Sequence, residues 1–349
     1  MTVPTLPGIT SRMIQTDRIN THLLSCGPRD GAPVVFIHGN FSAATYWEET
    51  MLALCDDYFC IAPDLRGYGD TENLVIDATR GPRDWTGDLK ALSDTFGDRP
   101  AHLVGWSLGA AVVMQFLLDY PELVSSLTLL NPVSPYGFGG TKGPDGTPCY
   151  DDYAGSGGGV VNPEFVRRIK EGDRSADDPN SPRNVIGAFY YKPPFKAARE
   201  EEFLTAALLQ STGDDRYPGD FTPSDNWPNV APGQFGPLNA TSPKYFNAGA
   251  IVDSPHKPPI LWVRGDSDQI VADNSLFDMG TLGKLELVPG WPGDDVYPPQ
   301  PMVTQMRNVL QQYQANGGAY REVVVEDAGH GAHIEKPGAF EEALRAHLG

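Results

Sequence analysis

Two glycines flank a serine at its second neighbours in the stretch GWSLG, residues 105–109. A short apolar run precedes this stretch, and a helical pattern, AAVVMQFLLD, follows it. A serine at a sharp turn between a strand and a helix has a strained backbone, so the residues two before and two after it must lack side chains. Gly105 and Gly109 meet that need. The pattern therefore predicts that Ser107 is a nucleophile presented at a strand-to-helix turn.

A serine hydroxyl is a poor nucleophile until a base takes its proton, and a carboxylate must keep that base in the correct tautomer. Such a serine predicts an acid and then a histidine further along the chain, each just after a strand, and a backbone donor for the oxyanion upstream. Candidates for all three occur in that order. The upstream donor is expected where the apolar run VVFI ends in the bend HGNF, residues 38–41. We expect the amides of Asn40 and Leu108 to form the oxyanion hole, with Phe41 as the neighbouring candidate.

Strands and helices alternate along the rest of the chain. The periodicity predicts an edge hairpin over 15–30, buried strands at 34–37, 58–63, 101–104, 127–130, 260–263 and 322–325, and helices at 84–96, 110–119, 302–314 and 337–347. This alternation is typical of a mostly parallel sheet with helices on both faces. The predicted class is therefore α/β.

The alternation stops after residue 132. Residues 133–257 are rich in proline, glycine and aromatic residues, with only two helical patches, near 163–170 and 200–210. An insertion of this kind at the carboxyl edge of a sheet would lie over the active site as a cap. We therefore predict a core of residues 1–132 and 258–349 with a cap insertion at 133–257, and a second, shorter insertion at 288–301.

Several motifs together resemble the α/β-hydrolase superfamily, in its serine-nucleophile branch. They are the HGN bend, DLRGYGD, GWSLG, GDSD and GHGAHIEKP, and the resemblance covers roughly residues 15–132 and 258–349. It implies the α/β-hydrolase fold, with Asp268 as the acid and His330 as the base. Asp266 stays open as a rival acid, although its side chain would point to the other side of a tight turn.

Two other polar groups near these motifs have simpler interpretations. His330, His333 and Glu335 imitate a metal cluster, but their spacing does not match HExxH, so no metal is expected. Asp64 and Arg66 are expected to fix their loop through structural pairing. No cofactor is expected.

Aromatic residues near the serine and in the cap are candidates for contact with an apolar or aromatic substrate. They are Phe41, Trp106, Tyr136, Phe138, Tyr190 and Tyr191, with Trp291 in the second insertion. The alternative is that the cap aromatics form a small core of their own.

The expected function is hydrolysis of an ester or a lactone of a small molecule through an acyl-enzyme on Ser107. Dehalogenases and epoxide hydrolases of similar architecture carry aspartate at the strand-to-helix turn, or nucleophile elbow, where this chain has Ser107. The serine therefore argues against both activities. Three alternatives stay open: an amide or C–C bond hydrolase, a cofactor-free haloperoxidase-like enzyme, and a binder of small ligands without turnover.

The charge composition limits the classes of partner that are expected. Lysine and arginine total 26 against 45 aspartate and glutamate, a net charge of −19, and this surface would repel nucleic acid and anionic membranes. The N-terminal stretch lacks the pattern of a signal peptide, and no apolar run is long enough to span a membrane. A cytoplasmic protein with a small-molecule substrate is expected, and a homo-oligomer is left open. The four cysteines are expected to be buried apolar residues.

Overall fold

The centre of the molecule is an eight-stranded sheet with the order β1-β2-β4-β3-β5-β6-β13-β14. The structure is a computed structural model that describes residues 3–97 and 99–349; residues 1, 2 and 98, which fall in the predicted core, lie outside the described residues. The strands are β1 (Thr10–Gln15), β2 (Asn20–Cys26), β3 (Ala32–Ile37), β4 (Tyr58–Pro63), β5 (Ala101–Trp106), β6 (Val124–Leu130), β13 (Ile260–Gly265) and β14 (Tyr320–Val325). β2 is antiparallel to both of its neighbours, and every pairing from β4 to β14 is parallel. The mostly parallel sheet is therefore confirmed.

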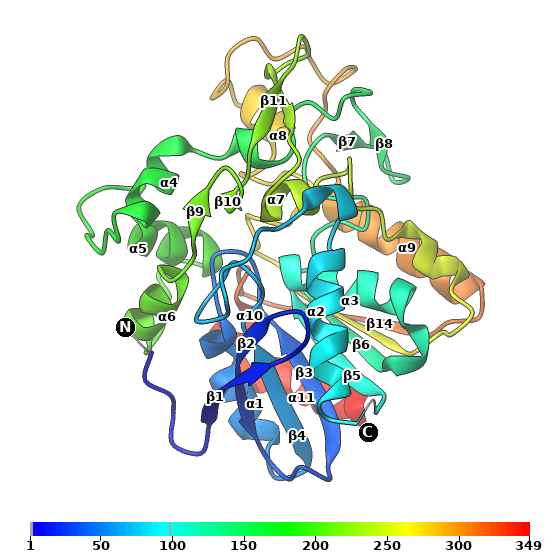
Figure 1. Cartoon of the computed structure of the whole chain (residues 1–349). Helices are drawn as coiled ribbons and strands as arrows, with labels where there is room; N and C mark the ends of the chain where they lie inside the picture. The colour runs from blue at the N-terminus through cyan, green and yellow to red at the C-terminus, as the bar shows by residue number, and fades with distance from the viewer. Residues whose placement is uncertain (1–2, 98) are drawn as a thin grey trace.

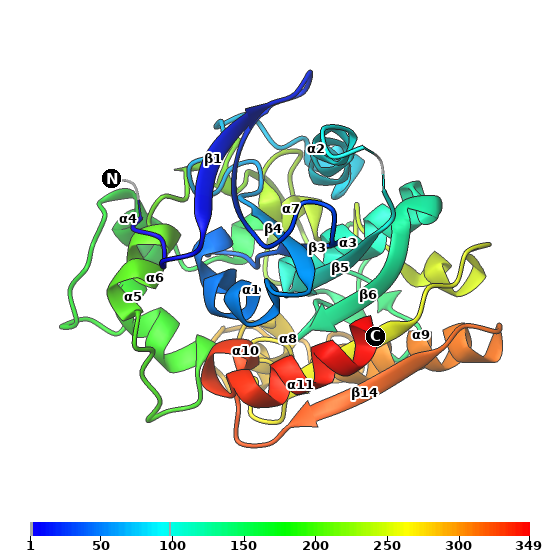
Figure 2. The same ribbon diagram turned by 90° about the horizontal axis from the view of Figure 1, so that it is seen from below.

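Helices cover both faces of this sheet (Figures 1 and 2). α2 (Arg83–Asp94), α3 (Leu108–Asp119) and α9 (Met302–Ala315) share one buried apolar cluster. α1 (Glu48–Leu54) and α11 (Pro337–Leu348) share the cluster on the other face. The central strands are mostly apolar because they are buried on both sides, with Ser126 and Thr128 as buried polar residues in β6.

An insertion leaves the sheet after β6 and returns at β13. Its elements are β7 (Thr141–Lys142), β8 (Thr147–Pro148), α4 (Pro163–Lys170), α5 (Pro182–Val185), a π-helical turn (Ile186–Tyr190), α6 (Glu200–Ala207), β9 (Thr212–Gly213), β10 (Tyr217–Pro218), β11 (Phe221–Pro223), β12 (Val230–Pro232) and α7 (Pro237–Ala240). Both predicted helical patches are confirmed, and the second ends three residues early. The expectation of only two was wrong, because α5, the π-helical turn and α7 are too short to give a helical period. The boundaries at 132/133 and 257/258 remain predictions.

The segment between β13 and α9 packs onto this insertion. It contains α8 (Met279–Lys284), and the Trp227 indole of the first insertion donates to the Pro289 carbonyl at 2.9 Å. The rings of Trp227 and Tyr297 lie 5.0 Å apart. The two insertions are therefore in contact, and β11 and α8 lie at the same end of the molecule, at the top of Figure 1.

Short elements account for most departures from the sequence-based expectations. The hairpin spans β1 and β2, earlier than the predicted 15–30, because the turn-rich residues 27–31 lead into β3 instead. α1, α8 and α10 (Ala332–Glu335) have too few turns to give a clear helical period. Short 3₁₀ turns occur at Ala44–Trp47, Ala78–Arg80, Pro121–Leu123, Gly158–Val160 and Gly249–Asp253. Among the described residues, no helix is both long and apolar enough to cross a membrane.

Candidate active site

Ser107 lies in a strained turn between β5 and α3. Its φ is 56° and its ψ is −116°, a conformation that L-residues rarely adopt. A Cβ atom on Gly105 would lie 2.5 Å from the Gly109 carbonyl oxygen, and one on Gly109 would lie 2.3 Å from the Ile37 carbonyl oxygen. Both positions therefore require glycine. For Gly109 the close neighbour is β3 rather than the other glycine.

The structure brings Asp268 and His330 into direct contact although 62 positions separate them in the sequence. His330 Nδ1 lies 2.8 Å from Asp268 Oδ2, and both side chains are 3% exposed. The other carboxylate oxygen accepts from the backbone amides of Ile270 at 2.8 Å and Val271 at 3.0 Å. The carboxylate is thus fixed on both oxygens, with one of them directed at the imidazole.

The rival acid, Asp266, lies in a different environment. It is exposed, and its Oδ1 accepts from the Ser267 hydroxyl at 2.8 Å. Asp268 is therefore the carboxylate that contacts the histidine.

The serine and histidine loops are joined through the residue before the serine. Trp106 Nε1 donates to the backbone carbonyl of His330 at 2.8 Å, and the Trp106 and His330 rings lie 5.5 Å apart. Trp106 itself has no exposed surface. It anchors the histidine loop to the residue that precedes Ser107.

Asn131 is a residue of this site whose role sequence reasoning missed. It follows β6 and has a positive φ of 39°. Its side-chain amide donates to the carbonyls of Gly329, at 3.1 Å, and His330, and its Oδ1 accepts from the Gly265 amide at 2.8 Å. Asn131 therefore links the ends of β6 and β13 to the loop that follows β14. The available signal is a polar residue directly after a buried strand.

His333 and Glu335, which imitate metal ligands in the sequence, are used otherwise. The His333 ring packs 4.5 Å from Trp47 and 4.9 Å from Trp106; burial, followed by the charge of His330, lowers the pKa of His333 to about 3. The Glu335 carboxylate accepts from the amides of Gly329 at 2.6 Å and Lys192 at 2.7 Å, while burial raises its pKa. Within residues 3–97 and 99–349, no three His, Cys, Asp or Glu side chains are grouped as metal ligands.

Asp64 and Arg66 fix their loop through different partners. The Asp64 carboxylate accepts from His22 Nδ1 at 2.7 Å and from the Ala44 amide at 2.7 Å. Arg66 makes a two-pronged pair with Asp88, with both distances at 2.8 Å. Both side chains have structural partners, as expected.

The peptide between Gly39 and Asn40, in the bend after β3, is held in one orientation. The Gly39 carbonyl accepts from His38 Nδ1 at 2.8 Å and from the Ser42 hydroxyl at 2.7 Å. In a trans peptide the N–H points opposite to the C=O, so the Asn40 amide faces away from these two donors. Leu108 is the first residue of α3, and the amide there has no acceptor within the helix.

The predicted substrate contacts divide into two groups. Phe41, Trp106, Tyr190 and Tyr191 are buried, whereas Tyr136, Phe138 and Trp291 are partly exposed. Trp291 Nε1 donates to the Tyr297 carbonyl at 2.8 Å. Contact with a substrate stays a prediction for all seven.

Comparison with known proteins identifies the family of this chain. Residues 34–343 match the family described as the Alpha/beta hydrolase family. An uncharacterised carboxylesterase of Bacillus subtilis is 28% identical over 182 residues, which cover 49% of this chain and 60% of that protein. Epoxide hydrolase 2 of Siraitia grosvenorii is 38% identical over 124 residues, 34% of this chain and 37% of that protein. The match covers less than two thirds of either relative's length.

A solved structure extends the likeness to nearly the whole chain. The carboxylesterase CesB of Bacillus subtilis superposes with a TM-score of 0.60 at 14% identity, covering 97% of this chain and 91% of that one. At this identity the likeness concerns the fold. With the elbow, the histidine–aspartate pair and the family match in agreement, the chain belongs to the α/β-hydrolase family.

Proposed function

We propose that this protein hydrolyses esters or lactones of apolar or aromatic small molecules through an acyl-enzyme on Ser107. His330 is the general base and Asp268 the orienting acid. The observation that carries the proposal is the 2.8 Å contact between His330 Nδ1 and Asp268 Oδ2, and it is supported by the backbone conformation of Ser107, which is that of a nucleophile elbow. The similarity to a carboxylesterase supports the same chemistry.

The proposed reaction proceeds in two halves. The Ser107 hydroxyl attacks the substrate carbonyl while His330 Nε2 takes its proton, and Asp268 stabilises the imidazolium that forms. The amides of Asn40 and Leu108 hold the oxyanion, and each such donor typically contributes about 10² to 10³ in rate. His330 then protonates the leaving alcohol, and water repeats the sequence to release the acid.

The epoxide hydrolase relative raises a different chemistry for the same fold. Opening an epoxide through a covalent intermediate needs a carboxylate nucleophile, which forms an alkyl ester. This chain has serine at the elbow, so the hydroxyl nucleophile favours acyl transfer over epoxide opening.

The direct test is labelling by a fluorophosphonate, followed by peptide mass spectrometry, together with hydrolysis of p-nitrophenyl butyrate. We expect the adduct on Ser107 and a loss of turnover on the order of 10⁶ in Ser107→Ala. An unlabelled Ser107, or an unchanged rate in Ser107→Ala, would reject the mechanism.

The chain offers a matched control for this test. Ser11 Oγ lies 2.8 Å from His22 Nε2, and His22 Nδ1 lies 2.7 Å from Asp64 Oδ2, so a second serine–histidine–aspartate array exists. Ser11 lies within β1, without a helix N-terminus beside it, and therefore lacks the donors that an oxyanion needs. Ser11→Ala should retain full activity, and an adduct on Ser11 would identify a different nucleophile.

Substrate panels separate ester hydrolysis from the alternatives. We expect turnover of aryl and alkyl esters and of lactones to exceed that of matched anilides and β-diketones. A faster anilide or diketone reaction would assign the same triad to amide or C–C bond cleavage.

A further inference from the structure

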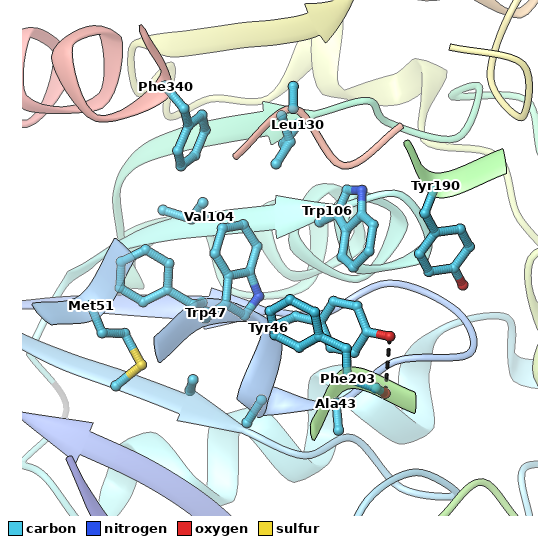
Figure 3. Packing of buried hydrophobic residues seen from close by; sticks show 14 of the residues in the cluster. Ala43, Tyr46, Trp47, Met51, Val104, Trp106, Leu130, Tyr190, Phe203 and Phe340 are labelled. Atoms are coloured by element: carbon cyan, nitrogen blue, oxygen red, sulfur yellow. Dashed lines mark hydrogen bonds between the residues drawn. The ribbon is translucent and has the colours of Figure 1, made fainter. Parts of the chain in front are cut away.

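Tyr190, at the end of the π-helical turn Ile186–Tyr190, contacts three loops of the candidate active site. Its hydroxyl donates to the Asn40 carbonyl at 2.6 Å and lies 3.1 Å from the Phe41 carbonyl. Its own carbonyl accepts from the Gly331 amide at 2.6 Å. Its ring packs against Trp106 (Figure 3), and the ring centroids lie 5.4 Å apart. One residue of the insertion thus touches the oxyanion loop, the histidine loop and the nucleophile elbow.

The hydroxyl of Tyr190 completes the fixation of Asn40. The peptide before Asn40 is fixed by the donors on the Gly39 carbonyl, and the peptide after it is fixed by Tyr190. The Asn40 side-chain oxygen accepts from Tyr68 at 2.9 Å. With both flanking peptides fixed, the direction of the Asn40 amide is set before a substrate binds, which is what effective oxyanion stabilisation requires.

The next residue shows why an external partner is needed here. Phe41 has a φ of 47° and is 2% exposed. A large residue in the left-handed region is strained and persists only where its surroundings enforce it. The carbonyls on both sides of the Phe41 Cα atom lie within reach of the Tyr190 hydroxyl.

A second contact joins the histidine loop to the segment of the insertion that contains Tyr190. The Glu335 carboxylate accepts from the amides of Gly329 and of Lys192, and Lys192 lies two residues after Tyr190. Tyr190 is itself 6% exposed. The surrounding core therefore fixes the position of Tyr190, and the Tyr190 hydroxyl in turn fixes the Asn40 carbonyl.

We propose that Tyr190 is a positioning residue that the insertion contributes to the oxyanion hole, acting through the Asn40 carbonyl. The inference rests on the proposed function, since it assigns the Asn40 amide to the oxyanion. The oxyanion hole then reaches its final geometry when the insertion packs onto the core and brings the Tyr190 hydroxyl to the Asn40 carbonyl.

The variant Tyr190→Phe removes the hydroxyl and keeps the ring. We expect kcat for p-nitrophenyl butyrate to fall about tenfold, while KM changes less than about twofold. The reason is that the direction of the Asn40 amide matters mainly in the transition state, where the oxyanion forms. A trifluoromethyl ketone, which forms an oxyanion on the enzyme, should bind more weakly by the same factor as kcat/KM falls. Hydrogen exchange of the amides in residues 39–42 should become faster.

Tyr46→Phe is the matched control. The Tyr46 hydroxyl donates to the Phe203 carbonyl at 3.1 Å, and its ring lies 5.6 Å from Trp106 in the same cluster (Figure 3). This variant loses a similar buried hydrogen bond without touching the oxyanion loop. We expect its kinetics and its exchange at residues 39–42 to match the parent protein.

Three outcomes would overturn the inference: unchanged exchange at residues 39–42 in Tyr190→Phe, inhibitor affinity equal to that of the parent protein, or equal losses in both variants. Failure of the proposed function is distinguishable, because the parent protein itself would then show no adduct on Ser107. Exchange at residues 39–42 still tests the link to Tyr190 in that case.

Discussion

Environment, rather than residue type, separates the two carboxylates of the GDSD turn. Asp268 is buried and contacts His330 Nδ1 at 2.8 Å, whereas Asp266 is exposed and contacts the neighbouring Ser267 hydroxyl. A side chain that holds a histidine tautomer must be fixed relative to the ring. At this scale the geometry distinguishes two neighbours that the sequence leaves as rivals.

Asp268→Asn and Asp266→Asn form a matched pair of variants. In Asp268→Asn the side chain can keep its bonds from the amides of Ile270 and Val271 but favours the wrong imidazole tautomer. We expect kcat to fall by about 10⁴, with little change in thermal stability. Asp266→Asn should stay within about twofold of the parent in kcat. Similar kcat values for the two variants would contradict the assignment of the acid.

At the scale of elements, the close approach of α3 to β3 sets the position of the elbow. A Cβ atom on Gly109 would lie 2.3 Å from the Ile37 carbonyl and 2.6 Å from the His38 carbonyl. Both are backbone atoms, so neither can move aside without shifting a strand. The glycine therefore serves the packing of helix on sheet as well as the turn.

Gly109→Ala and Gly338→Ala test this difference in urea unfolding. We expect Gly109→Ala to lower the free energy of unfolding by about 3 kcal/mol or to prevent folding, because overpacking here displaces backbone. Gly338, in α11, has open space where its Cβ would lie, and alanine there should raise stability by up to about 1 kcal/mol. A stable, fully active Gly109→Ala protein would disprove the packing argument.

At the scale of the whole molecule, the segment between β13 and α9, which packs onto the first insertion, contains a buried carboxylate. Asp278 has no exposed surface. Its Oδ2 accepts from the amides of Thr281 at 3.0 Å and Gln300 at 3.1 Å, while its Oδ1 has no hydrogen-bond partner. Burial raises the pKa of Asp278 to about 6. Because its pKa in the unfolded chain lies near 3.8, the folded protein binds more protons than the unfolded chain between these two values.

Stability should therefore fall as the pH rises through this window. The contribution of protonated Asp278 is fully present below about pH 4 and is lost as the pH passes through about 6. We expect Asp278→Asn to raise the free energy of unfolding at pH 7.5 by up to roughly 3 kcal/mol, and this gain should disappear near pH 4. Chemical denaturation at both pH values measures it. Asp294→Asn, at an exposed carboxylate paired with Lys284, is the control, and a gain that persists at pH 4 would contradict the prediction.

The sequence by itself determined the features that depend on local spacing. Gly105 follows from backbone sterics within the turn at Ser107, where a Cβ atom would meet the Gly109 carbonyl oxygen. α4 has the predicted bounds, Pro163–Lys170, because Asn162 caps it and proline favours the first helical position. The apolar runs also predict buried strands from local sequence, because a strand covered by helices on both faces of the sheet needs apolar side chains on both faces.

Only the tertiary structure decided which distant groups meet. Asn131 lies 199 positions from His330, and Tyr190 lies 150 positions from Asn40; no periodicity relates residues so far apart. The second insertion packs onto the first through contacts that are also distant in the sequence, between Trp227 and residues 289–297. Such contacts depend on the order of strands in the sheet and on how each loop leaves it, so the sequence predicts the reacting groups while the fold assigns the residues that hold them in place.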